Sequence, residues 1–161
     1  MLQGRPTEAI ACLEPRVSEM RWQYEVVLVS VLAEAYADMD DVAKAEEAVD
    51  IALTRAGMMN NRVDGLDASR VRAKILDLQG RREVATAALD EALSLTRSMP
   101  YPYAEAKLSR EYGMLHLRAG EPARAGEPLR AALEIFRRLE AKKDAEQTSR
   151  VLQGLGQAQG Q

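Results

Sequence analysis

Small residues return at a stride of forty along this chain of 161 residues. With Asp40, Gly80 and Gly120 taken as anchors, an alanine stands five residues after each anchor and another stands twelve residues after it. The matching positions are Ala33, Ala73 and Gly113 before the anchors, and Ala45, Ala85, Ala125, Val49, Leu89, Leu129, Ala52, Ala92 and Ala132 after them. Small side chains at fixed places on both sides of a turn let two helices cross with their backbones close together. The stride therefore predicts a helical hairpin that the chain repeats.

Composition and the breaks between apolar segments predict an all-α fold of about eight helices. Only 4% of the residues are aromatic, and Ala and Leu dominate the 47% that are hydrophobic. That composition favours helices. Clusters of glycine, asparagine and proline at 56–65 and 98–103 interrupt the helical segments. The predicted helices span 6–19, 22–38, 41–56, 64–79, 81–97, 102–119, 121–139 and 142–155.

Two stretches, LAEAYADMDDVAKAEEAVDIAL and REYGMLHLRAGEPARAGEPLRAAL, resemble the tetratricopeptide repeat. Ala33, Tyr36 and Ala45 match the small-residue and aromatic positions of that family, whereas Leu76 and His116 replace the aromatic residue in the later repeats. The stride of forty is longer than the roughly 34 residues usual for the family. The resemblance implies a right-handed superhelical solenoid of antiparallel helix hairpins.

The repeat divides the chain into the parts of a single tetratricopeptide-like domain. Within residues 1–161 these are a half repeat at 1–21, repeats at 22–59, 60–99 and 100–140, a capping helix at 141–156 and a tail at 157–161. Gly4 and Ala9 reproduce the anchor and its alanine, so the first helix resembles the second half of a hairpin whose first half is absent. Its Ile10, Leu13 and Val17 then have an incomplete partner, which predicts pairing with an upstream repeat or a second copy. The chain is expected to be a fragment of a larger protein that can form a homodimer through this half repeat.

Two irregularities interrupt the pattern. Ser69 and Arg72 stand at places expected to be apolar, which predicts a shifted register for the first helix of the middle repeat. The Gly-Glu-Pro triplet occurs twice between Gly120 and Pro128, and only the first copy is predicted to be a helix boundary. Pro128 then lies inside a helix and should bend it. The alternative is a helix that starts only near Glu127.

The last sixty residues are also similar to the C-terminal helical-repeat region of large bacterial regulators of the STAND ATPase type. The likeness rests on a Tyr-Ala-Glu-Ala helix start, the run Pro-Leu-Arg-x-Ala-Leu-x-x-Phe, and Leu139-Glu-Ala followed by Ala145-Glu. It implies a place in bacterial signal transduction or transcription regulation. The ATPase itself is not encoded here, because no G-x-x-x-x-G-K-[ST] motif occurs in the sequence.

Bulk properties argue against several classes of partner. A net charge of -3 and a pI near 5.4 give no broad basic surface for direct contact with nucleic acid. No apolar run reaches the roughly 18 residues that cross a bilayer, so no membrane contact is expected. Cys12 is the only cysteine, which excludes an intramolecular disulfide and favours a reducing, cytoplasmic location.

Catalytic chemistry finds little support in the sequence. His116 is the only histidine, so no histidine pair can hold zinc, and its place in the repeat predicts a packed, structural side chain. Cys12 lies between Ala11 and Leu13 with no basic neighbour in the sequence, which favours packing over nucleophilic reactivity. We therefore expect no enzyme activity and no cofactor.

The predicted binding surface is the concave groove that the first helices of stacked hairpins line. The candidate partner-binding residues are Ser30, Glu34, Arg70, Lys74, Asp77, Lys107, Arg110, Met114, Leu117 and Arg118, and Val27, Ala37 and Asp67 share the same faces. Five of these thirteen residues are cations, which predicts a peptide or protein partner that is acidic or offers its C-terminus. Three alternatives stay open: ordinary solvated helix faces, a small-molecule sensor, and a scaffold for self-association.

Overall fold

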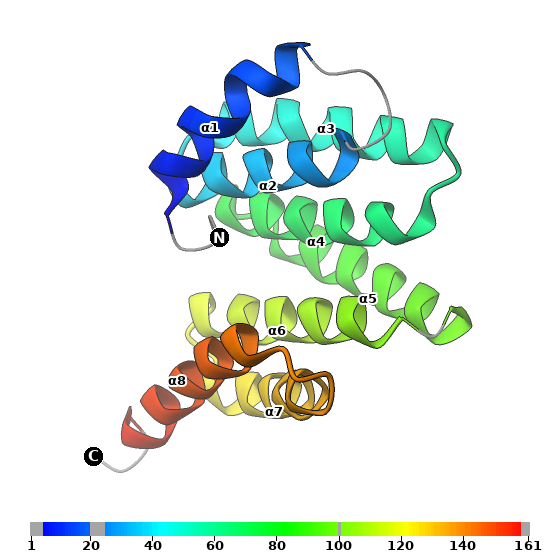
Figure 1. The fold of residues 1–161 in the computed structure, drawn as a ribbon. Helices are drawn as coiled ribbons and strands as arrows, with labels where there is room; N and C mark the ends of the chain where they lie inside the picture. Colours follow the sequence, from blue (N-terminus) through cyan, green and yellow to red (C-terminus); the bar gives the residue numbers. More distant parts are fainter. Residues whose placement is uncertain (1–4, 20–24, 100, 159–161) are drawn as a thin grey trace. The chain divides into compact units, whose positions relative to one another are not determined.

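A computed structural model describes residues 5–19, 25–99 and 101–158, and over these residues the chain forms eight α-helices and no strand (Figure 1). This confirms the all-helical prediction. The helices are α1 (Pro6–Glu19), α2 (Glu25–Asp38), α3 (Val42–Met58), α4 (Arg62–Leu78), α5 (Arg82–Ser98), α6 (Pro102–Arg118), α7 (Pro122–Arg138) and α8 (Lys142–Ala158). The predicted start of the second helix at residue 22 and the expected turn at Gly4 lie outside the described residues. The last helix runs to Ala158, three residues beyond its predicted end.

The chain divides into two compact units, Met1–Ala88 and Leu89–Gln161, and α5 is continuous through the boundary. In the first unit α1 packs on α2, α2 on α3 and α3 on α4, while α2 also packs directly on α4 (Figure 1). Its buried core consists mainly of alanine and valine, including Val29, Ala33, Val49, Ala52 and Val71, each with no exposed surface. The small side chains permit the close approach of helices that the sequence predicted.

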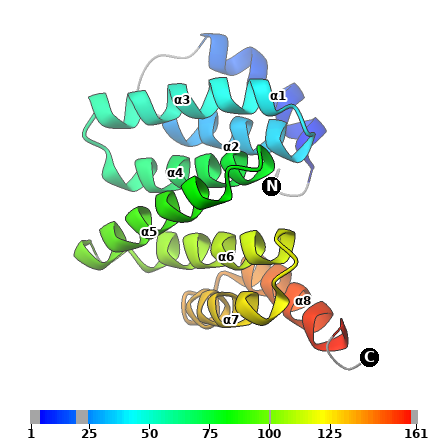
Figure 2. The ribbon, with the colours of Figure 1, turned by 180° about the vertical axis from the view of Figure 1, so that it is seen from behind.

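In the second unit α7 packs on both α6 and α8 (Figure 2). Phe136 is fully buried and meets the ring of Tyr103 edge to face, with 5.9 Å between the ring centroids. The Tyr103 hydroxyl donates to Asp144 Oδ2 at 3.1 Å, which joins α6 to α8. One aromatic pair with a polar tip thus links all three helices.

The turns repeat at twenty residues, half the stride seen in the sequence. Each helix from α3 to α8 has 17 residues, and each helix from α4 to α8 begins twenty residues after the one before. Five of the turns contain one residue with positive φ, and the next residue's N–H donates to the carbonyl five positions back at 2.9 Å. The positive-φ residues are Asp40 (61°), Asn60 (49°), Gly80 (77°), Gly120 (72°) and Glu140 (55°). This bonding pattern is the Schellman motif, which ends a helix and satisfies its last carbonyls.

The helix starts of α3 and α4 differ from those of α6 and α7. Asp41 and Asn61 cap α3 and α4, and each side chain accepts a bond from a backbone N–H of the first turn at 3.2 Å. Tyr101 and Glu121 make no such bond before α6 and α7, where the first helical residue is proline. Proline suits that position because its missing N–H would have had no partner within the helix.

The predicted register shift in the middle repeat is wrong. Ala73 is fully buried, as Ala33 is, whereas Ser69 and Arg72 are half-buried at the edge of α4. Arg72 tolerates this place because its guanidinium forms an ion pair with Asp50 of α3. The repeat therefore keeps its register, and its polar residues lie beside the core instead of within it.

The first helix packs against the core of its own unit. Leu13 is 4% exposed, and Ile10 and Val17 pack against the core shared by α2 and α3. The Tyr36 hydroxyl donates to Glu14 Oε1 at 2.7 Å, which adds a polar tie between α1 and α2. Leu13 is therefore buried within the unit, Ile10 and Val17 are partly buried, and the homodimer stays a prediction.

The second Gly-Glu-Pro triplet lies within a helix. α7 is continuous from Pro122 to Arg138 with Pro128 inside it, so the alternative of a helix starting near Glu127 is wrong. Pro128 has no N–H to donate to the Arg124 carbonyl. The predicted bend at this point stays a prediction.

Candidate functional site

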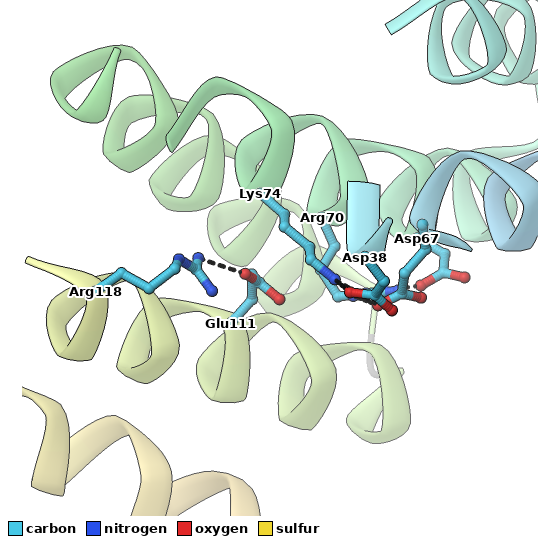
Figure 3. Close-up of polar contacts among 7 residues, drawn as sticks. Asp38, Asp67, Arg70, Lys74, Glu111 and Arg118 are labelled. Atoms are coloured by element: carbon cyan, nitrogen blue, oxygen red, sulfur yellow. Dashed lines mark hydrogen bonds and ion pairs between the residues drawn. The ribbon is translucent and has the colours of Figure 1, made fainter. Parts of the chain in front are cut away.

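A network of charged side chains joins α2 to α4 in the first unit (Figure 3). The Arg70 guanidinium donates to both carboxylate oxygens of Glu34, at 2.8 and 2.7 Å, and through Nε to Asp67 Oδ1 at 3.0 Å. Its side chain is only 7% exposed. A guanidinium with two parallel bonds to one carboxylate is held in a fixed orientation. Arg70 therefore acts as a clamp between the two helices.

Lys74 completes this network from the next turn of α4. Its ammonium forms an ion pair with Asp38 and lies 3.8 Å from Glu34 Oε1. The Lys74 side chain is 14% exposed, whereas that of Asp38 is 41% exposed. The two cations are therefore more buried than the carboxylates that they contact.

Two further candidate residues of the first unit lie in its interior. Ser30 is 1% exposed, and its hydroxyl donates to the Val26 carbonyl of the preceding turn at 2.7 Å. The Asp77 side chain is 1% exposed and accepts a bond from Arg82 Nε at 3.3 Å. Both side chains thus have intramolecular partners.

The candidate residues of the second unit all lie on α6. Glu111 is buried and accepts a bond from Arg118 Nη2 at 2.8 Å (Figure 3). The Lys107 ammonium lies 5.8 Å from the centroid of the Tyr103 ring, within the range of a cation–π contact. The remaining members of the group, Arg110, Met114 and Leu117, are half-buried.

Arg110 differs from the other cations of the group. Its Nε is a buried nitrogen with no hydrogen-bond partner in the described part of the chain. A buried N–H without an acceptor costs free energy, and the cost is larger in a charged group. This side chain is therefore the one in the candidate group with an unsatisfied buried donor among the described residues.

The histidine is packed as the sequence predicted. His116 is 7% exposed, and its ring lies 5.4 Å from that of Tyr112. Its Nδ1 lies 2.8 Å from Glu121 Oε2, and Arg124 also donates to that oxygen at 3.0 Å. The hydrogen bond with His116, together with Arg124, holds the pKa of Glu121 below its ordinary value of 4.5. The contacts among His116, Glu121 and Arg124 join the end of α6 to the first turn of α7.

Tyr36 occupies the matching place in the first unit and has a different environment. Burial, and then its hydrogen bond to the Glu14 carboxylate, raises the pKa of Tyr36 to about 12. The Lys44 ammonium lies 5.2 Å from the centroid of its ring. Tyr36 thus ties together α1, α2 and α3, and its role is structural.

Among the described residues there is no group of three or more His, Cys, Asp or Glu side chains that could hold a metal ion. Within the same ranges, no helix is both long enough and apolar enough to cross a bilayer.

Sequence reasoning placed the candidate residues on the correct helices but missed their partners. Asp38 was not a candidate, although it forms an ion pair with Lys74. Glu111 was not one either, although it pairs with Arg118 seven residues later, two turns along the same helix. The spacing of seven residues between Glu111 and Arg118 can be read from the sequence, because it places both residues on one face of a helix. The pairs between α2 and α4 join residues 36 positions apart, and only the packing of the helices reveals them.

Comparison of the chain with protein-family models, with curated proteins and with solved structures gives no match.

Proposed function

We propose that this chain is a non-catalytic protein-interaction module built from tetratricopeptide-like hairpins. It binds a peptide or a partner domain on the surface formed by the first helix of each hairpin. In this proposal the hairpins stack as a right-handed superhelical solenoid. The module acts in the cytoplasm within a larger bacterial signal-transduction or transcription regulator.

One observation supports this proposal above the others: α2 packs directly on α4, although α3 lies between them in the sequence. Stacked hairpins bring the first helices of consecutive repeats side by side, and those helices line the recognition surface of solenoid proteins. The charged network of Glu34, Arg70 and Lys74 lies along this contact.

The proposed binding surface can be tested with a displayed library of random peptides selected on the whole chain. Selected peptides are then measured by fluorescence anisotropy against Val27→Lys on α2 and Met114→Lys on α6. Val84→Lys on α5 is the matched control, because Val84 is 47% exposed and Val27 is 44% exposed. A lysine placed inside an interface should weaken binding about tenfold or more, whereas the control should bind as the parent does.

Two results would contradict the proposal. One is a selection that yields no peptide with saturable binding. The other is an equal loss of affinity in Val84→Lys and in the two first-helix variants, since the bound surface would then not be the one proposed. Circular dichroism of each variant checks that the helices are intact.

No observation on the described residues favours the two alternative functions over the peptide-binding module. A small-molecule sensor would be stabilised against heat by one member of a metabolite collection. A self-association scaffold would give a dimer in light scattering. Its interface would have to lie elsewhere than on the buried Leu13 of α1.

A further inference from the structure

Four of the five cations in the candidate group already interact within the chain. Arg70 binds Glu34 and Asp67, Lys74 binds Asp38, Arg118 binds Glu111, and the Lys107 ammonium lies over the Tyr103 ring. A cation that is already paired gains less from an external carboxylate, because the existing bond must first be given up. The sequence predicted an acidic partner from five cations. At these four positions the attraction to such a partner is therefore reduced.

The fifth cation, Arg110, has a hydrogen-bond donor that no acceptor in the described part of the chain satisfies. Its Nε is buried and has no acceptor there. The guanidinium stays charged at all physiological pH values, so it cannot lower the cost by losing a proton. Its neighbour Glu111 is bonded to Arg118. Beyond the described residues, water or a ligand can supply an acceptor for Arg110.

The surroundings of Arg110 on α6 indicate what kind of ligand fits. Lys107 lies three residues before Arg110 and Met114 four residues after it, so all three share one face of the helix. Met114 and Leu117 are half-buried on this face. Two cations beside two apolar side chains suit an acidic group carried by a peptide more than a free anion, since the apolar groups add contact area.

We propose that Arg110 is the anchoring residue for a carboxylate of the partner. The inference rests on the proposed function, because it assumes that a peptide binds along α6. A carboxylate on the guanidinium edge that includes Nε supplies the missing acceptor and accepts two parallel bonds. The carboxylate belongs to an Asp or Glu side chain or to the C-terminus of the partner, and the chemistry of the contact is the same.

The experiment measures binding of fluorescein-labelled hexaglutamate to the whole chain by anisotropy, with the peptide C-terminus either free or amidated. Arg110→Gln should weaken binding about tenfold or more, the loss that follows from removing one charge-assisted contact. Arg110→Lys should lose part of the affinity, since it keeps the charge but not the planar pair of donors. Arg138→Gln, on the exposed end of α7, removes the same charge elsewhere and should change affinity less than twofold.

A second readout does not depend on affinity. The side-chain Nε–H signal of Arg110 in a ¹⁵N NMR spectrum, assigned by its loss in Arg110→Gln, should shift as hexaglutamate is added. Binding of both peptide forms would assign the carboxylate to side chains, and binding of the free-acid form alone would assign it to the C-terminus. Either result supports the inference.

Three outcomes would overturn it. Arg110→Gln and Arg138→Gln could weaken binding equally, the Nε–H signal could stay unmoved at saturation, or hexaglutamate could fail to bind while library-selected peptides bind. The last outcome would leave the proposed function standing and remove only the role of Arg110. Failure of every peptide, library-selected ones included, would instead remove the proposed function.

Discussion

The hairpins α2–α3 and α6–α7 occupy positions eighty residues apart and solve the same packing problem with different side chains. Where the helices cross, the first hairpin places Ala33 and Val49 in its core, and the later one places Gly113 and Leu129. In the later hairpin the residue on the first helix is smaller, glycine in place of alanine, and the residue on the second helix is larger, leucine in place of valine. A Cβ atom added at Gly113 would lie 2.5 Å from Leu129 Cγ, so the space that Ala33 fills with a methyl group is filled there by leucine. These two hairpins thus preserve the total side-chain volume at the crossing, although the residues differ.

The largest effect is expected from giving the later hairpin the alanine of the first. Gly113→Ala should lower the free energy of unfolding by about 3 kcal/mol, because the new methyl group overlaps Leu129 close to the backbone. Adding Leu129→Val should recover most of this loss, since valine is what the first hairpin pairs with alanine. Urea denaturation of the two single variants and the double variant gives the coupling energy. Independent, additive effects would show that the two sites do not share one volume.

The second comparison concerns the residue just before Val49 and Leu129 in the second helix of each hairpin. The first hairpin has Ala48 there and the later one has Pro128. Pro128→Ala should raise the free energy of unfolding by about 2 kcal/mol, because it restores the bond to the Arg124 carbonyl and removes the clash of the ring. Pro122→Ala in the first turn of α7 is the control and should change stability by about 0.5 kcal/mol or less. An equal response at both prolines would mean that Pro128 is not strained.

The third comparison concerns the turns. Asp40 and Gly120 both have positive φ, at 61° and 72°. Gly120→Ala should cost about 1 kcal/mol from backbone conformation alone, since an added Cβ meets no atom within 4 Å. Gly57→Ala is the control, because it also meets no atom within 4 Å but lies in α3 without positive φ. Thermal unfolding should show Gly57→Ala unchanged or stabilised, and a loss equal to that of Gly120→Ala would contradict the argument.

The last comparison concerns Tyr36 and His116, which occupy the same place in the two hairpins. The pKa of Tyr36 is raised from 10.0 to about 12, so the folded state holds its proton more tightly than the unfolded state. The stability that this contributes is fully present below pH 10 and is lost as the pH rises towards 12. Tyr36→Phe should therefore lose less stability than the parent over this interval, as measured by urea denaturation at each pH. Identical pH profiles would show that the pKa of Tyr36 is not raised.

The sequence by itself determined the helices and, among the described residues, their ends to within three residues. Turn residues, proline at the first helical position and alanines at a fixed stride act through bonds and contacts within one hairpin, so a local pattern is enough to predict them. The predicted register shift around Ser69 and Arg72 was wrong for a related reason. Polarity alone does not distinguish a core position from one at the edge, where Arg72 reaches Asp50 on another helix.

Only the tertiary structure decided which charged groups are paired. Arg70 and Glu34 lie 36 residues apart in sequence and meet because α2 packs on α4. The spacing of the ten candidate residues assigned them to helix faces. It could not show that most of the cations among them form ion pairs within the chain. Nor could it show that the buried Nε of Arg110 has no acceptor among the described residues. The reason is physical: helix ends depend on neighbours along the chain, whereas an ion pair depends on distance in space.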